Sequence, residues 1–169
     1  MEDKKIYSAQ EISNYIIEYS NSKGYSIKNI RLQKTLYAVQ GLSLLNRDMP
    51  AFNEKIEAWK YGPVVPDIYY NYASYGPSEI TKEGIMSNMI IFTSLGIQEK
   101  EYSNDLISSD MKEVIESTVD FFSKMKDFDI VDWSHAHTAW FSTYNPDNIH
   151  VEINHEKISN TFKAMFANE

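Results

Sequence analysis

Hydrophobic residues recur at helical spacing in the first part of the chain and predict two helices that pack as a hairpin. Ser8 and Glu11 have the spacing of a capping box, and an apolar stripe that starts at Ile12 follows them. Lys23-Gly24 supplies a basic last turn and a C-terminal glycine. A second apolar stripe, over residues 29–47, predicts the next helix.

Residues 53–61 are the strand candidate of the first half. Ile56 and Ala58 fall on one face of this stretch, and Glu57 and Trp59 fall on the other. The chain is then expected to turn at Gly62-Pro63 and to become helical near Pro66, because proline is tolerated in the first turn of a helix. Gly76-Pro77 should end that helix.

The second half is less uniform. Residues 86–92 fit a strand or a short helix equally well, and residues 96–104 read as a polar loop. Apolar stripes predict helices over 109–126 and 129–140, and Asn154 can cap a last helix after the alternating residues 149–153. We therefore expect a single domain over residues 1–169, mostly α (α+β). It should have about five to six helices and a small β element near residues 53–61 and 149–153.

Composition removes several classes of protein. The chain has no cysteine, which excludes disulfides, thiolate zinc sites and a cysteine nucleophile. No apolar run approaches the roughly 20 residues that span a bilayer, and the polar N-terminus does not resemble a secretory signal. A cytoplasmic protein is expected, without contact to a membrane.

Charge is distributed unevenly between the halves. Residues 1–84 contain ten Lys/Arg and ten Asp/Glu, whereas residues 85–169 contain six and fourteen. The excess of acidic residues argues against direct nucleic-acid binding, because most non-specific affinity for nucleic acids comes from basic side chains that neutralise phosphates. An acidic half suits a protein partner with a basic surface, or it is only a solubilising face.

The residues that could carry chemistry form no recognisable catalytic or metal site. His135 and His137 would point about 200° apart on a helix, so a shared metal is not expected. No nucleophile elbow, phosphate-binding loop or dinucleotide motif is present. The sequence therefore predicts neither a cofactor nor a metal, and it favours a protein that is not an enzyme.

Aromatic residues are the unusual feature of this composition. Ten of the twelve tyrosines lie within residues 1–75, and four of them crowd into residues 69–75. A helix cannot bury Tyr69 and Tyr70 equally, and an exposed tyrosine is a common interface anchor. The candidate partner-binding residues are two of these tyrosines and three acids expected on the outward face of the 109–126 helix, although simple solvent exposure would explain them too: Tyr70, Tyr75, Glu113, Glu116 and Asp120.

Three motifs in the same order resemble the Panacea domain, the family of SocA-like antitoxins and phage-associated proteins. They are Leu-Gln-Lys-Thr-Leu-Tyr at 32–37, Ala-Trp-Lys-Tyr-Gly-Pro-Val at 58–64 and His-Thr-Ala-Trp at 137–140. Thr35 departs from the usual leucine, and either His135 or His137 can align with the family histidine. The residues carrying this fold signature are Leu32, Lys34, Tyr37, Trp59, Tyr61, Gly62, Pro63, Val64, His137 and Trp140.

The resemblance implies an antitoxin of a type II toxin–antitoxin pair. Family members neutralise a toxin encoded beside them by direct binding, and their toxins include alarmone-synthetase-like enzymes that stop translation. The resemblance also leaves open an adaptor that delivers a toxin to a Clp-type protease, a phage-encoded inhibitor of a host enzyme, and an enzyme that reverses the toxin's modification. The signature is expected to hold the fold, so Trp59→Ala or Gly62→Val should unfold the protein.

Overall fold

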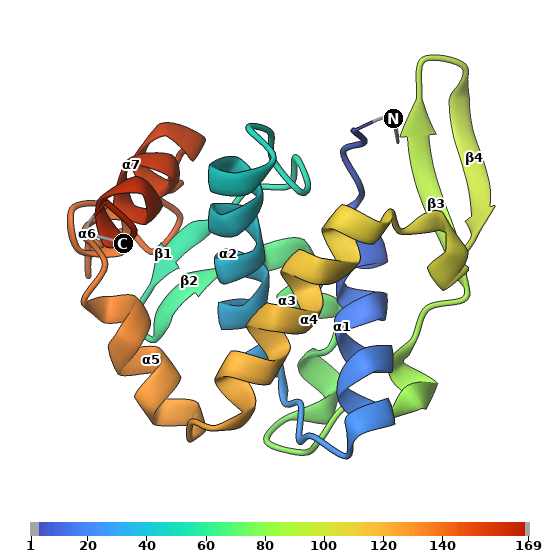
Figure 1. The fold of residues 1–169 in the computed structure, drawn as a ribbon, viewed down its shortest axis with the longest axis horizontal. Coiled ribbons are helices and arrows are strands. Elements are labelled where there is room, and N and C mark those ends of the chain that lie inside the picture. Colours follow the sequence, from blue (N-terminus) through green and yellow to red (C-terminus); the bar gives the residue numbers. More distant parts are fainter. Residues whose placement is uncertain (1–3, 168–169) are drawn as a thin grey trace.

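Helix α2 (Asn29–Asn46) runs through the middle of the molecule, and most of the other α-helices pack against it (Figure 1). The computed structural model describes residues 4–167. Twelve of the eighteen residues of α2 are buried, on every side of the helix, which is the pattern of a core helix rather than a surface one. On one side of it lie α1 (Ala9–Lys23) and α4 (Ser109–Ser123), and on the other α5 (Asp127–His135) and α7 (His155–Met165).

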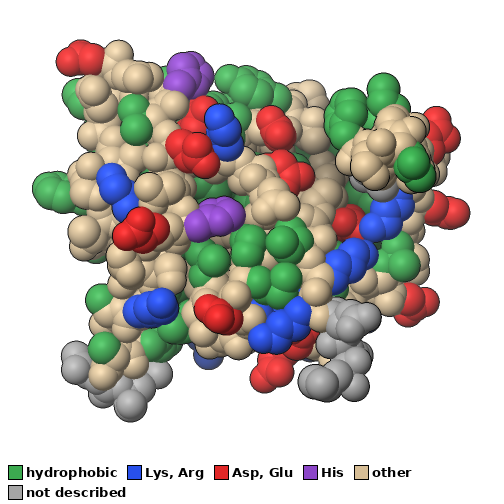
Figure 2. All heavy atoms as spheres, turned by 90° about the horizontal axis from the view of Figure 1, so that it is seen from above, with side chains coloured by type: hydrophobic (Ala, Val, Ile, Leu, Met, Phe, Trp, Pro, Cys, Tyr) green, Lys and Arg blue, Asp and Glu red, His purple; other side chains and the backbone are tan. Residues whose placement is uncertain are grey.

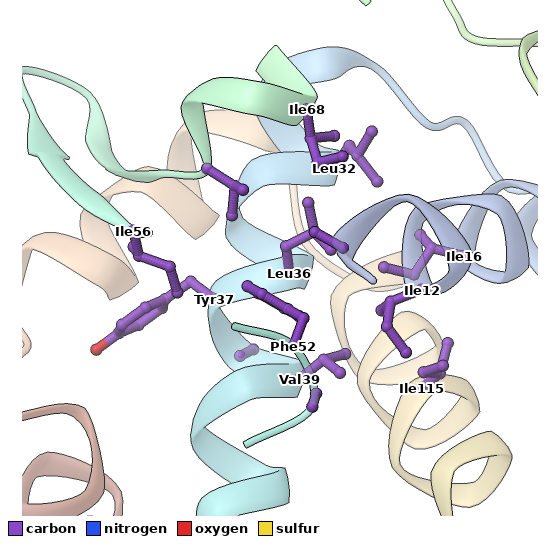
Figure 3. Packing of buried hydrophobic residues seen from close by; sticks show 14 of the residues in the cluster. Ile12, Ile16, Leu32, Leu36, Tyr37, Val39, Phe52, Ile56, Ile68 and Ile115 are labelled. Carbon is purple, nitrogen blue, oxygen red and sulfur yellow. The ribbon is translucent and has the colours of Figure 1, made fainter. Parts of the chain in front are cut away.

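The hydrophobic core lies where α1, α2 and α4 meet (Figure 3). Ile12 and Ile16 of α1, Leu36 of α2 and Ile115 of α4 are all fully buried there. Their spacing is the helical one that the sequence predicted, so the hydrophobic stripes bury one face of each outer helix against α2. Tyr37 also belongs to α2, but its hydroxyl points away from this cluster.

The predicted ends of α1 are confirmed. Ser8 Oγ accepts a hydrogen bond from the Glu11 amide at 3.1 Å, and the Glu11 carboxylate accepts one from the Ser8 amide at 2.8 Å. Gly24 ends the helix in the left-handed region, with φ of 72°. The mostly helical α+β class is confirmed as well.

The first β element is a short hairpin, which differs from the predicted strand over residues 53–61. Strand β1 (Glu57–Trp59) pairs antiparallel with β2 (Gly62–Val64), so the turn lies at 60–61 and not at Gly62-Pro63. Pro63 is tolerated in β2 because this strand pairs on one side only. As predicted, α3 (Pro66–Asn71) begins at Pro66; it continues into a 3-10 turn (Ala73–Tyr75) that stops at Gly76.

A second hairpin projects from the body beside α1 (Figure 1). After a 3-10 turn (Lys82–Gly84), strand β3 (Asn88–Thr93) pairs antiparallel with β4 (Gly96–Glu101), and a further 3-10 turn (Asn104–Leu106) leads to α4. The prediction of a loop over 96–104 is therefore wrong. A two-residue connection at 94–95, followed by Gly96 with φ of 111°, closes the hairpin.

Two other boundaries differ from the sequence expectation. The predicted helix over 129–140 is two helices, α5 and α6 (Thr138–Phe141), separated at 136–137. The stretch 149–153 makes a single bridge, from Glu152 to Glu57, where one pair of backbone hydrogen bonds joins it to residues 56–58. Asn154 caps α7 as predicted, accepting from the Lys157 amide at 2.9 Å.

Candidate functional site

The three signature motifs meet at one place, and a hydrogen bond joins each pair of them. Lys34 Nζ, on α2, donates to the carbonyl oxygen of Pro63 in β2 at 3.1 Å. Trp140 Nε1, on α6, donates to the carbonyl oxygen of Trp59 in β1 at 2.8 Å. The Tyr37 hydroxyl and His137 Nδ1 lie 3.0 Å apart and close the triangle. The motifs are therefore parts of one structure, although up to about a hundred residues separate them.

Gly62 allows the hairpin to approach α2 and α5 this closely. A β-carbon at this position would lie 2.5 Å from both Lys34 Cε and Ser134 Oγ, well inside van der Waals contact. Its φ of 102° also favours glycine. Gly62 is required by both the space and the backbone conformation.

The two histidines of the late motif have different surroundings. His137 is buried and packs edge-on against Trp133, with ring centroids 4.1 Å apart, and burial lowers its pKa to about 4. His135 stacks on Trp140 at 4.0 Å, and its Nε2 is buried without a hydrogen-bond partner. Its pKa is lowered, mainly by burial. Because His137 bonds to Tyr37, it is the histidine that joins the signature together.

A pocket of about 370 Å³ opens beside this junction. Aromatic rings from Trp59, Tyr61 and Tyr69 form much of its wall. Lys34 and Lys60 are the basic residues among the described lining residues, which include no Asp or Glu. The full lining is Asn29, Ile30, Gln33, Lys34, Trp59, Lys60, Tyr61, Val64, Tyr69, Ala73, Gly76 and Ile149.

Lys34 is the unusual group of this pocket. Its side chain is 1% exposed, and within residues 4–167 no carboxylate lies within ion-pair distance of its ammonium. Burial lowers its pKa to about 7, because the charged form loses its hydration and gains no counter-ion. Perturbed buried groups of this kind are concentrated at functional sites.

The predicted partner-binding residues do not form one cluster. Tyr70 is 63% exposed and packs edge-on against Trp59, whereas Tyr75 is half-buried against Tyr72. Glu113 lies on α4 and is exposed. Tyr70 and Glu113 therefore have the accessibility that a contact residue needs, on different elements of the fold.

Glu116 and Asp120 do not point outward as expected. The Glu116 carboxylate accepts a hydrogen bond from the Tyr15 hydroxyl at 2.5 Å, and the Asp120 carboxylate accepts one from Tyr19 at 3.1 Å. Both acids are half-buried along the seam between α4 and α1. Their position four residues apart on the α1 side of the helix gives them an internal role.

The projecting hairpin carries an exposed hydrophobic face that the sequence reading missed. Ile90, Phe92 and Ile97 are 67%, 82% and 70% exposed, and the strand register places them on one side together with Glu99. Leu95 at the tip is 87% exposed. Hydrophobic side chains gather on this part of the molecule at the upper right of Figure 2. The available signals were Gly96 and the short apolar run over residues 89–92 before it.

Within residues 4–167 no cluster of His, Asp and Glu side chains is arranged to hold a metal ion. None of the helices there has the length and hydrophobicity that crossing a membrane requires. Two surface features are suited to binding: the pocket that Lys34 lines and the exposed apolar face of the β3–β4 hairpin.

A family model and a curated relative both point to the same protein family. The model for the antitoxin SocA-like Panacea domain matches residues 32–141, which contain all three motifs. The chain is 30% identical over 89 residues to a protein named antitoxin SocA from Caulobacter vibrioides (strain NA1000 / CB15N). That match covers 53% of this chain and 47% of the relative, so it spans about half the relative's length. No solved structure matches this chain. With more than half of its residues matched by the family model, the chain belongs to the SocA-like family of Panacea-domain proteins.

Proposed function

We propose that this chain is an antitoxin that acts in the cytoplasm by binding a cognate protein toxin and covering its active site. The observation that carries the proposal is the family match over residues 32–141, together with the similarity to a protein named antitoxin SocA. We propose further that the toxin is a translation-inhibiting enzyme of the alarmone-synthetase type with a basic surface. Inhibition by coverage needs no catalytic group on this chain.

The projecting hairpin is the surface best suited to contact the toxin. Ile90, Phe92 and Ile97 present a continuous apolar face, and exposed apolar patches of this kind mark protein interaction sites. Glu99 lies beside them on the same face, which favours a partner with an apolar patch flanked by cationic groups.

The body of the molecule holds the hairpin in place from its other face. Met89 is 5% exposed and contacts Asn14 of α1, and Lys100 makes an ion pair with Glu11. A partner would therefore meet a positioned hairpin rather than a freely moving one. The accessible Tyr70 and Glu113 remain proposed contacts, whereas Tyr75, Glu116 and Asp120 would have to leave partners within the fold.

The test is co-expression with the toxin encoded beside this chain. We expect growth to be rescued, a stable complex to be purified, and the toxin's activity to fall in proportion to the amount of antitoxin added. Toxin that stays fully active beside an excess of this protein would contradict direct inhibition. Rescue that disappears only in a host lacking the Clp-type protease would instead support an adaptor.

The hairpin is tested separately with a matched pair of variants. The double change Phe92→Ser and Ile97→Ser should abolish the complex, since it removes the apolar face from residues that make little contact with the body. Phe141→Ser is the control, because Phe141 is 75% exposed but belongs to α6. Equal loss of binding in both variants, or in neither, would exclude the hairpin as the specific contact.

A further inference from the structure

Lys34 lies at the junction of the signature motifs with part of its hydrogen-bonding capacity unused. An ammonium group has three donors, and among the described residues 4–167 only the Pro63 carbonyl accepts from it at hydrogen-bond distance. Its neighbours among the described residues offer no carboxylate: β2 presents Gly62 and Pro63, and α5 presents Ser134. The nearby ionisable groups are the basic His135 and Lys60 and the phenols of Tyr61 and Tyr69.

Such a cation is costly to keep without a partner. An ammonium buried in an apolar environment is strongly destabilising unless it is paired or loses its proton. A methionine of similar length would fill the same space without this cost. The presence of a buried lysine in the 32–37 motif therefore suggests a partner that comes from outside this chain.

The pocket determines the kind of molecule that can supply the partner. Its volume of about 370 Å³ lies in the range of small-ligand sites, roughly 300–1,000 Å³. Trp59, Tyr61 and Tyr69 suit a flat apolar body, because aromatic rings pack well edge-to-face or offset. A single buried cation balances a single negative charge, which favours a carboxylate over a phosphate dianion.

We propose that this pocket binds a carboxylate carried on an apolar or aromatic body, with the ammonium of Lys34 as its counter-ion and Trp59 as part of the wall around that body. Two sources share this chemistry: the C-terminal residue of a polypeptide and a free aromatic monocarboxylic acid. The site is distinct from the projecting hairpin and does not depend on the antitoxin function.

The direct test is calorimetric titration of the full chain with 3-phenylpropionate and with its amide. We expect the acid to bind at least about tenfold more tightly than the amide, because a hydrogen bond to a charged group contributes more than a neutral one. Lys34→Met should remove this preference, whereas Lys60→Met should retain it, since Lys60 is exposed at the pocket mouth. Equal binding of acid and amide, or no binding of either at millimolar concentration, would overturn the proposal.

Two peptides that end in phenylalanine distinguish the sources. A peptide with a free carboxylate that binds more tightly than 3-phenylpropionate, while its amidated form does not bind, assigns the site to a chain terminus. Tighter binding of the small acid assigns it to a free ligand.

Proton uptake provides a second readout, which mere apolar binding would not give. At pH 8 the titration, repeated in two buffers with different ionisation enthalpies, should report uptake of roughly one proton per carboxylate bound, because ion pairing favours the charged form of Lys34. His135 is the other group nearby that could take up a proton, so the same measurement on Lys34→Met isolates the lysine. Uptake that persists in this variant would overturn the assignment.

Discussion

The ammonium of Lys34 lies 3.1 Å from the carbonyl oxygen of Pro63, and this contact joins the central helix to the β1–β2 hairpin inside a buried environment. Within the described residues 4–167, no carboxylate pairs with this ammonium. The same lysine therefore connects two signature motifs and lowers the stability of the fold, and the consequences of both properties can be measured.

Replacing Lys34 by methionine should stabilise the free protein and change its pH profile. The pKa of Lys34 falls from 10.5 in the unfolded chain to about 7 in the fold. Between these values the unfolded state binds more protons, so stability rises with pH across this window and the destabilisation is complete below pH 7. At about 1.4 kcal/mol per pH unit, the effect is of order 5 kcal/mol.

Denaturant unfolding of both proteins at several values between pH 7 and 10.5 measures this effect. The difference in the free energy of unfolding between the variant and the original should shrink as the pH rises, because other titrating groups affect both proteins equally. A difference that does not change with pH would mean that Lys34 keeps its ordinary pKa in the fold.

Gly62→Ala should be clearly more destabilising than Gly24→Ala. Both glycines have positive φ, which costs a residue with a β-carbon about 1–2 kcal/mol. A β-carbon at 24 meets nothing within 4 Å, whereas one at 62 collides with Lys34 and Ser134, adding about 1–3 kcal/mol. Thermal and denaturant unfolding measure the loss of stability in each variant. Gly24→Ala gives the cost of backbone strain alone, and Gly62→Ala gives the cost of strain plus collision. Equal effects would show that the hairpin can move away from α2.

Trp59→Ala should leave a folded protein, contrary to the expectation from the sequence that it unfolds the chain. The Trp59 ring is half-buried on the pocket wall, and its link to the late motif runs through its backbone carbonyl, which the change retains. Trp140→Ala removes an indole that is 8% exposed and donates that hydrogen bond, so it should cost about 3–5 kcal/mol. Near-ultraviolet circular dichroism and unfolding of both variants test this order, and a larger loss for Trp59→Ala would reverse the assignment.

Glu116 and Glu113 of α4 should differ in how much their removal destabilises the fold. Glu116→Ala should lower the free energy of unfolding by about 1–3 kcal/mol, because the Tyr15 hydroxyl loses a charged acceptor. Glu113→Ala should change it by less than about 0.5 kcal/mol, since Glu113 is exposed. Unfolding in denaturant compares the two, and binding measurements on both then separate contact with a partner from packing against α1. A stability loss at Glu113 would contradict this division.

Helical elements could be predicted from the sequence because their signals are local. The Ser8–Glu11 capping box, the stripe of α4 and the Asn154 cap all depend on residues within a few positions of one another. The β segments were less predictable, since a pairing such as Trp59 with Gly62 depends on how the strands meet. The 96–101 strand resembles a loop in composition because five of its six residues are exposed to solvent.

The pocket could be predicted only in part. The resemblance identified Lys34, Trp59 and His137 as parts of one signature. It predicted that these residues support the fold, and it did not predict a pocket. The surroundings of Lys34, in which no described carboxylate pairs with it, follow from the approach of α5 and β2 to α2, and no local sequence pattern encodes them. The expectation that Glu116 faces outward failed for a similar reason, since its partner Tyr15 lies about a hundred residues away.

Acid should destabilise the fold through His137. Burial lowers the pKa of His137 to about 4 from 6.5 in the unfolded chain, so between these values the unfolded state binds more protons and stability falls as the pH falls. The two values differ by about 2.5, which corresponds to roughly 3 kcal/mol. Protonation would also make both ring nitrogens donors, so that Nδ1 could only donate to the Tyr37 hydroxyl across this side of the triangle of motifs.

Unfolding measured from pH 7 to pH 4 on the original protein and on His137→Gln tests this effect. Glutamine can still accept a hydrogen bond from Tyr37 but does not titrate, so the variant should lose less stability on acidification. His150→Gln is the matched control, because His150 lies in an exposed turn and its ring contacts the Glu57 carboxylate at 3.1 Å, away from the buried motifs. If the two variants show the same pH profile, the acid sensitivity arises from the carboxylates of the fold and not from the buried histidine that joins α2 to the late motif.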